Sequence, residues 1–88
     1  MPARVRMFTT LVCPYCIRAK MLLKKKSVDF EEIDVSADHD MRAWLVKTTG
    51  RRTVPQIFIN DEAIGGFDEM YALDQSGELD KKLQQTAA

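Results

Sequence analysis

The sequence has no excess of charge of either sign and no long apolar run. Its 13 lysines and arginines balance its 13 aspartates and glutamates, so net charge gives no reason to expect a nucleic acid, a membrane surface or a strongly acidic partner. No apolar stretch approaches the roughly 18 residues of a membrane span, and residues 1–10 lack the apolar core of a secretory signal. We therefore expect a cytoplasmic protein.

Cysteine and histidine are also scarce. The 88 residues contain two cysteines and one histidine, His39, whereas a structural zinc site needs about four such ligands. We therefore expect no metal site, and we place His39 at the surface. The chain has no repeats, low-complexity tracts or linkers, and its length suits one domain over residues 1–88.

The two cysteines belong to one motif, Cys13-Pro14-Tyr15-Cys16. Proline is favoured at the first helical position, so the motif places Cys13 at a helix N-cap, where free backbone N–H groups and the helix dipole favour thiolate over thiol. Cys16 follows one turn later, and such neighbours need only slight adjustment to form a disulfide. We expect Cys13 to be the exposed sulfur and Cys16 the shielded one.

Two other interpretations of the cysteine pair exist. Half of a zinc site would lack its remaining ligands, and two plain core cysteines would leave the proline and the helix start unexplained. In a reducing compartment a Cys-x-x-Cys pair is more often catalytic or metal-binding than a permanent disulfide. The motif therefore favours reversible redox chemistry.

Hydrophobic patterns divide the chain into alternating strands and helices. The first strand, helix and second strand form a βαβ unit with parallel pairing, and Asn60-Asp61 is a turn signal for a hairpin. Trp44 is expected in the core. The expected strands cover residues 4–9, 28–35, 54–59 and 62–64, and the expected helices cover 14–26, a segment capped by Ser36 or Asp38 and closed by Gly50, 68–76 ending at Gly77, and a short terminal segment around Leu79 and Leu83.

This order of elements, with a redox motif at the first strand-to-helix junction, resembles the glutaredoxins that have a dithiol Cys-Pro-Tyr-Cys site. The resemblance covers nearly the whole chain and also rests on Thr53-Val54-Pro55 and on Gly65-Gly66 followed by Phe67-Asp68. It implies an α/β, thioredoxin-like fold in which a central mixed four-stranded sheet (β-α-β-α-β-β-α) is flanked by helices.

The resemblance also implies that Pro55 is cis and that the backbone of Val54 pairs with the cysteinyl part of glutathione. A cis X-Pro bond turns the preceding backbone groups outward, where an extended peptide can pair with them. The plain alternative is a trans proline on an edge strand.

The family's other glutathione contacts map onto a few further residues. The loop Gly66-Phe67-Asp68 would hold the γ-glutamyl end, since N–H groups at a helix start suit its carboxylate and Asp68 suits its ammonium; Asp68 can equally be an N-cap. Tyr15 would line the groove beside the reacting sulfur. Arg52 is a candidate partner of the glycyl carboxylate, or else a solvated loop residue.

One position departs from the family. Many relatives carry a lysine three residues before the first cysteine, and this chain has Thr10. One charged contact to glutathione and one contribution to thiolate stabilisation are therefore not carried over.

The resemblance implies an enzyme, a glutathione-dependent thiol–disulfide oxidoreductase. The Cys13 thiolate would attack mixed disulfides of glutathione, and Cys16 would resolve the intermediates formed with protein disulfides. Glutathione is then a co-substrate, no cofactor is permanently bound, and the partners of the expected monomer are disulfide-bonded or glutathionylated proteins.

Two rival functions use the same fold. A thioredoxin-like electron donor served by a flavoprotein reductase would not need the glutathione loop at residues 65–68. An iron-sulfur carrier would use Cys13 from two subunits with glutathione as a further ligand, and the stiffness of Pro14 disfavours it.

Overall fold

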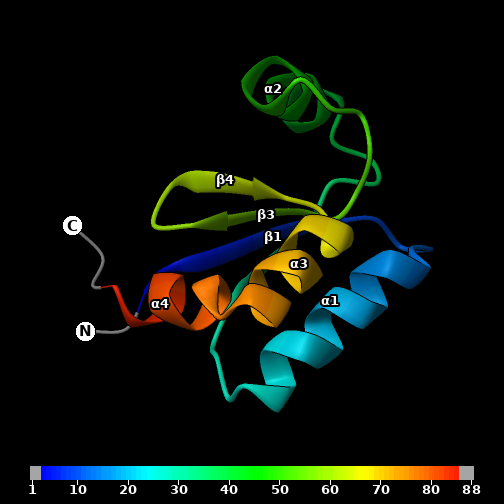
Figure 1. Cartoon of the computed structure of the whole chain (residues 1–88). Coiled ribbons are helices and arrows are strands. Elements are labelled where there is room, and N and C mark those ends of the chain that lie inside the picture. The colour runs from blue at the N-terminus through cyan, green and yellow to red at the C-terminus, as the bar shows by residue number, and fades with distance from the viewer. Residues whose placement is uncertain (1–2, 86–88) are drawn as a thin grey trace.

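The computed structural model describes residues 3–85, which form a four-stranded sheet between helices (Figure 1). The strands lie in the order β2-β1-β3-β4. β1 pairs in parallel with β2, while β1 with β3 and β3 with β4 are antiparallel, so the predicted mixed sheet is confirmed. The strands are β1 (Val5–Thr9), β2 (Glu31–Asp34), β3 (Gln56–Ile59) and β4 (Glu62–Gly65).

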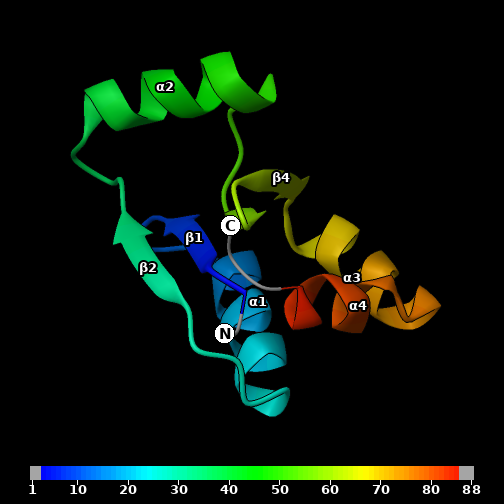
Figure 2. The ribbon, with the colours of Figure 1, turned by 90° about the vertical axis from the view of Figure 1, so that its left-hand side faces the viewer.

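Helices cover both faces of this sheet (Figures 1 and 2). α1 (Pro14–Lys25), α3 (Phe67–Ser76) and the short α4 (Glu78–Gln84) lie against one face, and α2 (His39–Thr49) lies over the other. Within residues 3–85 no helix has the length and apolar character needed to cross a membrane. The thioredoxin-like arrangement expected from the sequence is thus the one observed.

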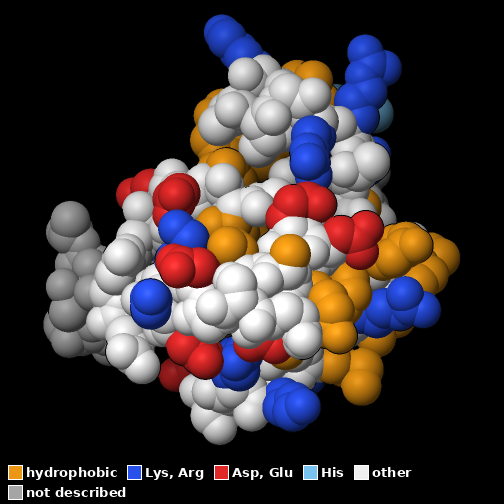
Figure 3. All heavy atoms as spheres, in the orientation of Figure 1, with side chains coloured by type: hydrophobic (Ala, Val, Ile, Leu, Met, Phe, Trp, Pro, Cys, Tyr) orange, Lys and Arg blue, Asp and Glu red, His pale blue; other side chains and the backbone are white. Residues whose placement is uncertain are grey.

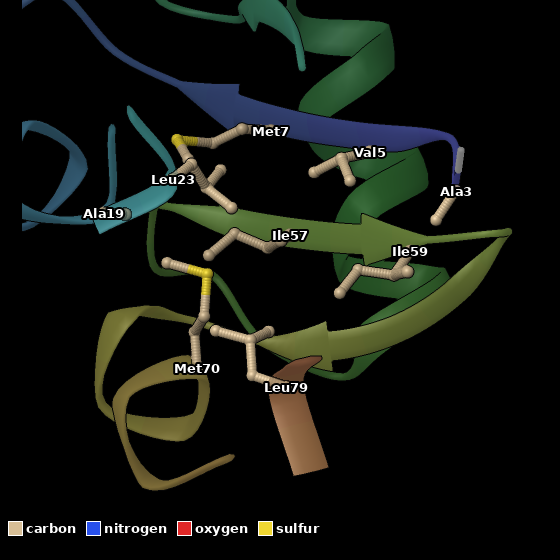
Figure 4. Packing of buried hydrophobic residues seen from close by; sticks show 9 residues of the cluster. All are labelled: Ala3, Val5, Met7, Ala19, Leu23, Ile57, Ile59, Met70 and Leu79. Atoms are coloured by element: carbon tan, nitrogen blue, oxygen red, sulfur yellow. The ribbon is translucent and has the colours of Figure 1, made fainter. Parts of the chain in front are cut away.

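The larger hydrophobic core lies between the sheet and α1, α3 and α4 (Figure 4). Side chains alternate along a strand, so β3 sends Ile57 and Ile59 into this core and Phe58 into a smaller cluster beneath α2. The central strands β1 and β3 are therefore covered on both faces. This packing fixes the positions of the strand ends next to which the functional motifs lie. The larger cluster contains Ala3, Val5, Met7, Ala19, Leu23, Ile57, Ile59, Met70 and Leu79.

Local signals fixed the ends of the helices. Asp38 caps α2, because its Oδ1 accepts a hydrogen bond from the Met41 N–H at 2.9 Å. Gly50 and Gly77 follow α2 and α3 with φ of 75° and 84°, the left-handed conformation that favours glycine. These predicted boundaries are confirmed.

The second strand is shorter than predicted. The chain is still turning away from α1 at Ser27, whose φ is 57°, and the Val28 N–H bonds the Leu23 carbonyl at 3.0 Å. Val28 and Phe30 pack against the larger core without joining the strand. Hydrophobic pattern alone does not separate apolar residues that pair in a sheet from apolar residues that only pack on it.

Trp44 is less buried than predicted, with 40% of its surface exposed. Its ring lies 5.8 Å from that of Phe8 and 5.9 Å from that of Phe58, measured between centroids. The indole therefore covers the edge of the smaller cluster, and it is Leu45, 4% exposed, that α2 buries in it.

Candidate active site

Cys13 and Cys16 form a disulfide at the start of α1, with their Cα atoms 5.1 Å apart. Cys13 is the N-cap and Pro14 the first helical residue, as predicted. The Cys16 N–H donates to Cys13 Sγ at 3.1 Å, so a helix-start donor already faces the sulfur that would carry the thiolate charge.

Both cysteines are buried in this disulfide form. Cys13 is 7% exposed and Cys16 is 2% exposed, so the prediction of an exposed Cys13 is wrong for the oxidised protein. The loop that precedes β3 accounts for part of this, because the Val54 carbonyl oxygen lies 3.7 Å from Cys13 Sγ. Only the tertiary fold brings that loop, 41 residues away in sequence, over the sulfur.

The Val54–Pro55 peptide bond is cis, as the resemblance implied. Pro55 is buried just before β3, and Val54 is half-buried beside the disulfide. The second motif therefore lies directly against the first.

A groove of about 260 Å³ joins the sequence motifs. Neither cysteine lines it, but it reaches Val54, whose carbonyl oxygen lies beside Cys13 Sγ. Its walls are the start of α1, the loop before β3 and the start of α3. The predicted contact residues lie in it, with the exception of Arg52. The lining is formed by Tyr15, Arg51, Thr53, Val54, Pro55, Gly66, Phe67, Asp68 and Glu69.

The two consecutive arginines occupy different surroundings. Arg52 lines a second pocket, of about 230 Å³, together with Arg42 of α2, whereas Arg51 lines both this pocket and the groove. Sequence reasoning chose Arg52 and missed Arg51. Adjacent residues of the same type carry no local signal that tells them apart, because their directions depend on how the chain leaves Gly50.

Glu69 is the other groove residue that sequence reasoning missed. Its Oε1 accepts the Gly66 N–H at 2.8 Å and also accepts from Nη1 of Arg51. These two partners, first the Gly66 N–H and then Arg51, lower the pKa of the Glu69 carboxyl below its usual value. A glutamate three residues after an N-cap is the signal of a capping box and could have revealed this contact.

The N-cap of α3 is Gly66, and the predicted capping role of Asp68 is wrong. Asp68 is the second residue of the helix and is exposed on the groove. Because the Glu69 carboxylate already accepts the hydrogen bond of the Gly66 N–H, the Asp68 carboxylate is not needed as a cap.

Thr10 lies between β1 and α1 and does not line the groove. The next residue, Leu11, is held in place because its N–H donates to Ser36 Oγ at 2.8 Å.

The surface around the start of α1 is apolar (Figure 3). The exposed hydrophobic residues there are Leu11, Val12, Tyr15, Ile17 and Met21. The Arg18 guanidinium stands 5.4 Å from the centre of the Tyr15 ring, a cation–π distance.

Comparison with known proteins decides the family. The family model described as Glutaredoxin matches residues 5–64. The chain belongs to the glutaredoxin family. Glutaredoxin 3 of Escherichia coli K12 is 48% identical over 82 residues, which is 93% of this chain and 99% of the relative.

Solved glutaredoxins also share the fold. The solution structure of glutaredoxin from Brucella melitensis has a TM-score of 0.85 at 46% identity and covers 94% of this chain and 90% of its own. The crystal structure of a buckwheat glutaredoxin–glutathione complex has a TM-score of 0.86 at 31% identity and covers 92% of this chain and 76% of its own. With its cysteine pair at disulfide distance, this glutaredoxin is a glutathione-dependent thiol–disulfide oxidoreductase of the dithiol class.

In the reduced protein, the Cys13 thiol should titrate at least about one pKa unit below a free cysteine. The Cys16 N–H that faces its sulfur stabilises the thiolate, whereas Cys16 is buried and should titrate at or above the free value. Thiolate absorbance followed against pH in Cys16→Ser and Cys13→Ser measures each group alone. A Cys13 titration matching that of free cysteine would refute the capping argument.

Proposed function

We propose that the Cys13 thiolate removes glutathione from glutathionylated proteins and small thiols. It attacks the glutathionyl sulfur, which forms a Cys13–glutathione disulfide and releases the substrate as a thiolate that takes a proton from water. The thiolate of a second glutathione then attacks the sulfur of the bound one. Glutathione disulfide leaves, and Cys13 returns as thiolate.

Protein disulfides require Cys16 as the resolving residue. After Cys13 attacks a protein disulfide, the Cys16 thiolate displaces the reduced protein and forms the Cys13–Cys16 disulfide. The single observation that supports this route is the existing disulfide between helical neighbours with Cα atoms 5.1 Å apart. Two glutathione molecules then reduce it and leave as glutathione disulfide.

The groove suits an extended glutathione molecule. We place its cysteinyl unit along the backbone of Val54, whose carbonyl lies beside Cys13 Sγ, with Thr53 and cis Pro55 on either side and Tyr15 as a wall. The γ-glutamyl end then reaches the first turn of α3, where N–H groups lack intrahelical partners. These donors suit its α-carboxylate, and the exposed Asp68 suits its ammonium.

The glycyl end would point the other way. The groove and the second pocket share Arg51, Thr53 and Val54, so a tripeptide paired with Val54 spans from one to the other. Arg52 lines the second pocket and is the proposed partner of the glycyl carboxylate, in a chain that has Thr10 where many relatives have lysine.

Arg52→Ala should raise the Michaelis constant for glutathione by less than about fivefold, because the binding free energy lost with an exposed ion pair is small. The turnover number should change little, because the contact lies away from the reacting sulfurs and acts equally in ground and transition states. Steady-state kinetics at two salt concentrations measure both constants. Arg4→Ala, which removes an exposed arginine paired with Glu31, is the control, and an unchanged Michaelis constant in Arg52→Ala would make Arg52 a solvated loop residue only.

We also propose that residues 1–88 act as a single domain and as a monomer in the cytoplasm, with glutathione as co-substrate and no resident cofactor. All residues that line the groove come from one chain, which supports a monomeric protein.

A disulfide-reduction assay that supplies either glutathione or a thioredoxin reductase tests which of the two reduces this protein. Turnover with glutathione is expected, and turnover with the reductase alone contradicts the proposal.

A further inference from the structure

Glu69 joins two walls of the groove through one oxygen atom. Its Oε1 accepts the Gly66 N–H of the α3 wall at 2.8 Å and also accepts from Nη1 of Arg51 in the loop before β3. The guanidinium of Arg51 is therefore held next to the first turn of α3, one carboxylate oxygen away from the Gly66 backbone.

The Arg51 side chain keeps binding capacity in this position. A guanidinium has five N–H donors, and the contact to Glu69 involves Nη1. The side chain is 49% exposed, so a solute can reach it. Among the described residues that line the groove, Arg51 alone carries a positive charge, and the exposed Asp68 lines the same groove.

We propose that Glu69 is a positioning residue, which holds Arg51 so that its guanidinium binds the α-carboxylate of the γ-glutamyl unit. This inference rests on the proposed binding of that unit at the start of α3. Arg51 and the helix N–H groups then face the carboxylate while Asp68 faces the ammonium, so both charges of the amino-acid end are met.

The rigidity of Glu69 makes it suited to this task. It lies on α3, and the Gly66 N–H fixes its carboxylate independently of Arg51. A free arginine samples many rotamers and must lose them on binding. With the ion pair already formed, glutathione meets an ordered guanidinium.

Glu69→Gln tests the proposal with three reductants. Besides glutathione, the assay uses γ-aminobutyryl-cysteinyl-glycine, which keeps the amine and lacks the α-carboxylate, and γ-glutamylcysteine, which lacks the glycine. The amide oxygen of the variant still accepts the Gly66 N–H, so α3 keeps its start, while the loss of the carboxylate charge removes the ion pair that holds Arg51. We expect the preference for glutathione over the γ-aminobutyryl analogue, as a ratio of kcat/KM, to fall about two- to fivefold. The preference over γ-glutamylcysteine should not change.

Two further variants and a control separate a positioning role of Glu69 from simple support of the fold. Arg51→Gln leaves the Glu69 contact to Gly66 in place and should lower the same preference, and the double variant should lose no more than Arg51→Gln alone. Glu62→Gln is the matched control, since it removes a carboxylate paired with Lys82 at 2.8 Å away from the groove. It should leave both preferences unchanged, and urea midpoints check the folding of each variant.

The inference is overturned if Glu69→Gln leaves the preference for glutathione over the γ-aminobutyryl analogue unchanged. It is also overturned if the variant changes the preference over γ-glutamylcysteine instead. Additive losses in the double variant also overturn it. Each of these three outcomes leaves a wild-type protein that turns over with glutathione, whereas a wild type inactive with glutathione refutes the proposed function itself.

Discussion

Cys13→Ser should abolish the reduction of both glutathione mixed disulfides and protein disulfides, by about a thousandfold or more. The Cys13 sulfur occupies the N-cap of α1 and accepts the Cys16 N–H, and a serine hydroxyl at this position is not ionised at neutral pH. Cys16→Ser should keep most of the activity on mixed disulfides, because glutathione itself completes that cycle. Reduction of protein disulfides that need a resolving thiol should be lost.

Assays of each variant on a glutathionylated peptide and on a protein disulfide measure the two activities. Thermal unfolding in reducing buffer checks that both variants are folded at the assay temperature, since Cys16→Ser places a hydroxyl at a buried position. Equal losses in the two variants on the glutathionylated peptide would show that the cysteines are equivalent, contrary to the assignment.

Gly65→Ala should lower the free energy of unfolding by about 2–4 kcal/mol. Gly65 has a φ of 107°, a conformation that costs a residue with a Cβ about 1–2 kcal/mol. A Cβ here would also stand 2.7 Å from Oε1, 2.9 Å from Cγ and 3.0 Å from Cβ of Glu69, so the Glu69 side chain must shift. Urea unfolding measures the loss, and the displaced Glu69 should also weaken glutathione binding.

Gly77→Ala is the matched control. Gly77 has a φ of 84° and no atom within 4 Å of an added Cβ, so this variant carries the backbone cost alone. The difference between the two variants, at least about 1 kcal/mol, isolates the contact with Glu69. Equal losses would show that this contact is not rigid.

The motif Cys13-Pro14-Tyr15-Cys16 could be understood from the sequence because its physics is local. The N-cap position follows from Pro14, and the disulfide distance follows from the spacing of three residues on one helix. The caps at Asp38, Gly50 and Gly77 were likewise predictable, since each depends on backbone groups within one turn.

Some features of the site were predicted from the resemblance to a known family and not from the spacing of residues. The cis Val54–Pro55 bond and the meeting of this loop with Cys13 depend on contacts across 41 residues. No periodicity reports such a contact, and it was expected only because the motifs stand in a familiar order.

The sequence by itself thus determined the redox chemistry and the order of the elements, because these depend on short spacings and strong turn residues, whereas most of the groove was expected only from the resemblance to a known family. The tertiary structure decided the exposure of Cys13 and Trp44 and the choice of Arg51 over Arg52 for the groove. It also decided the pairing of Arg51 with Glu69, 18 residues apart. Burial and ion pairing depend on which surfaces the packed elements bring together, and neighbouring residues in sequence do not encode that.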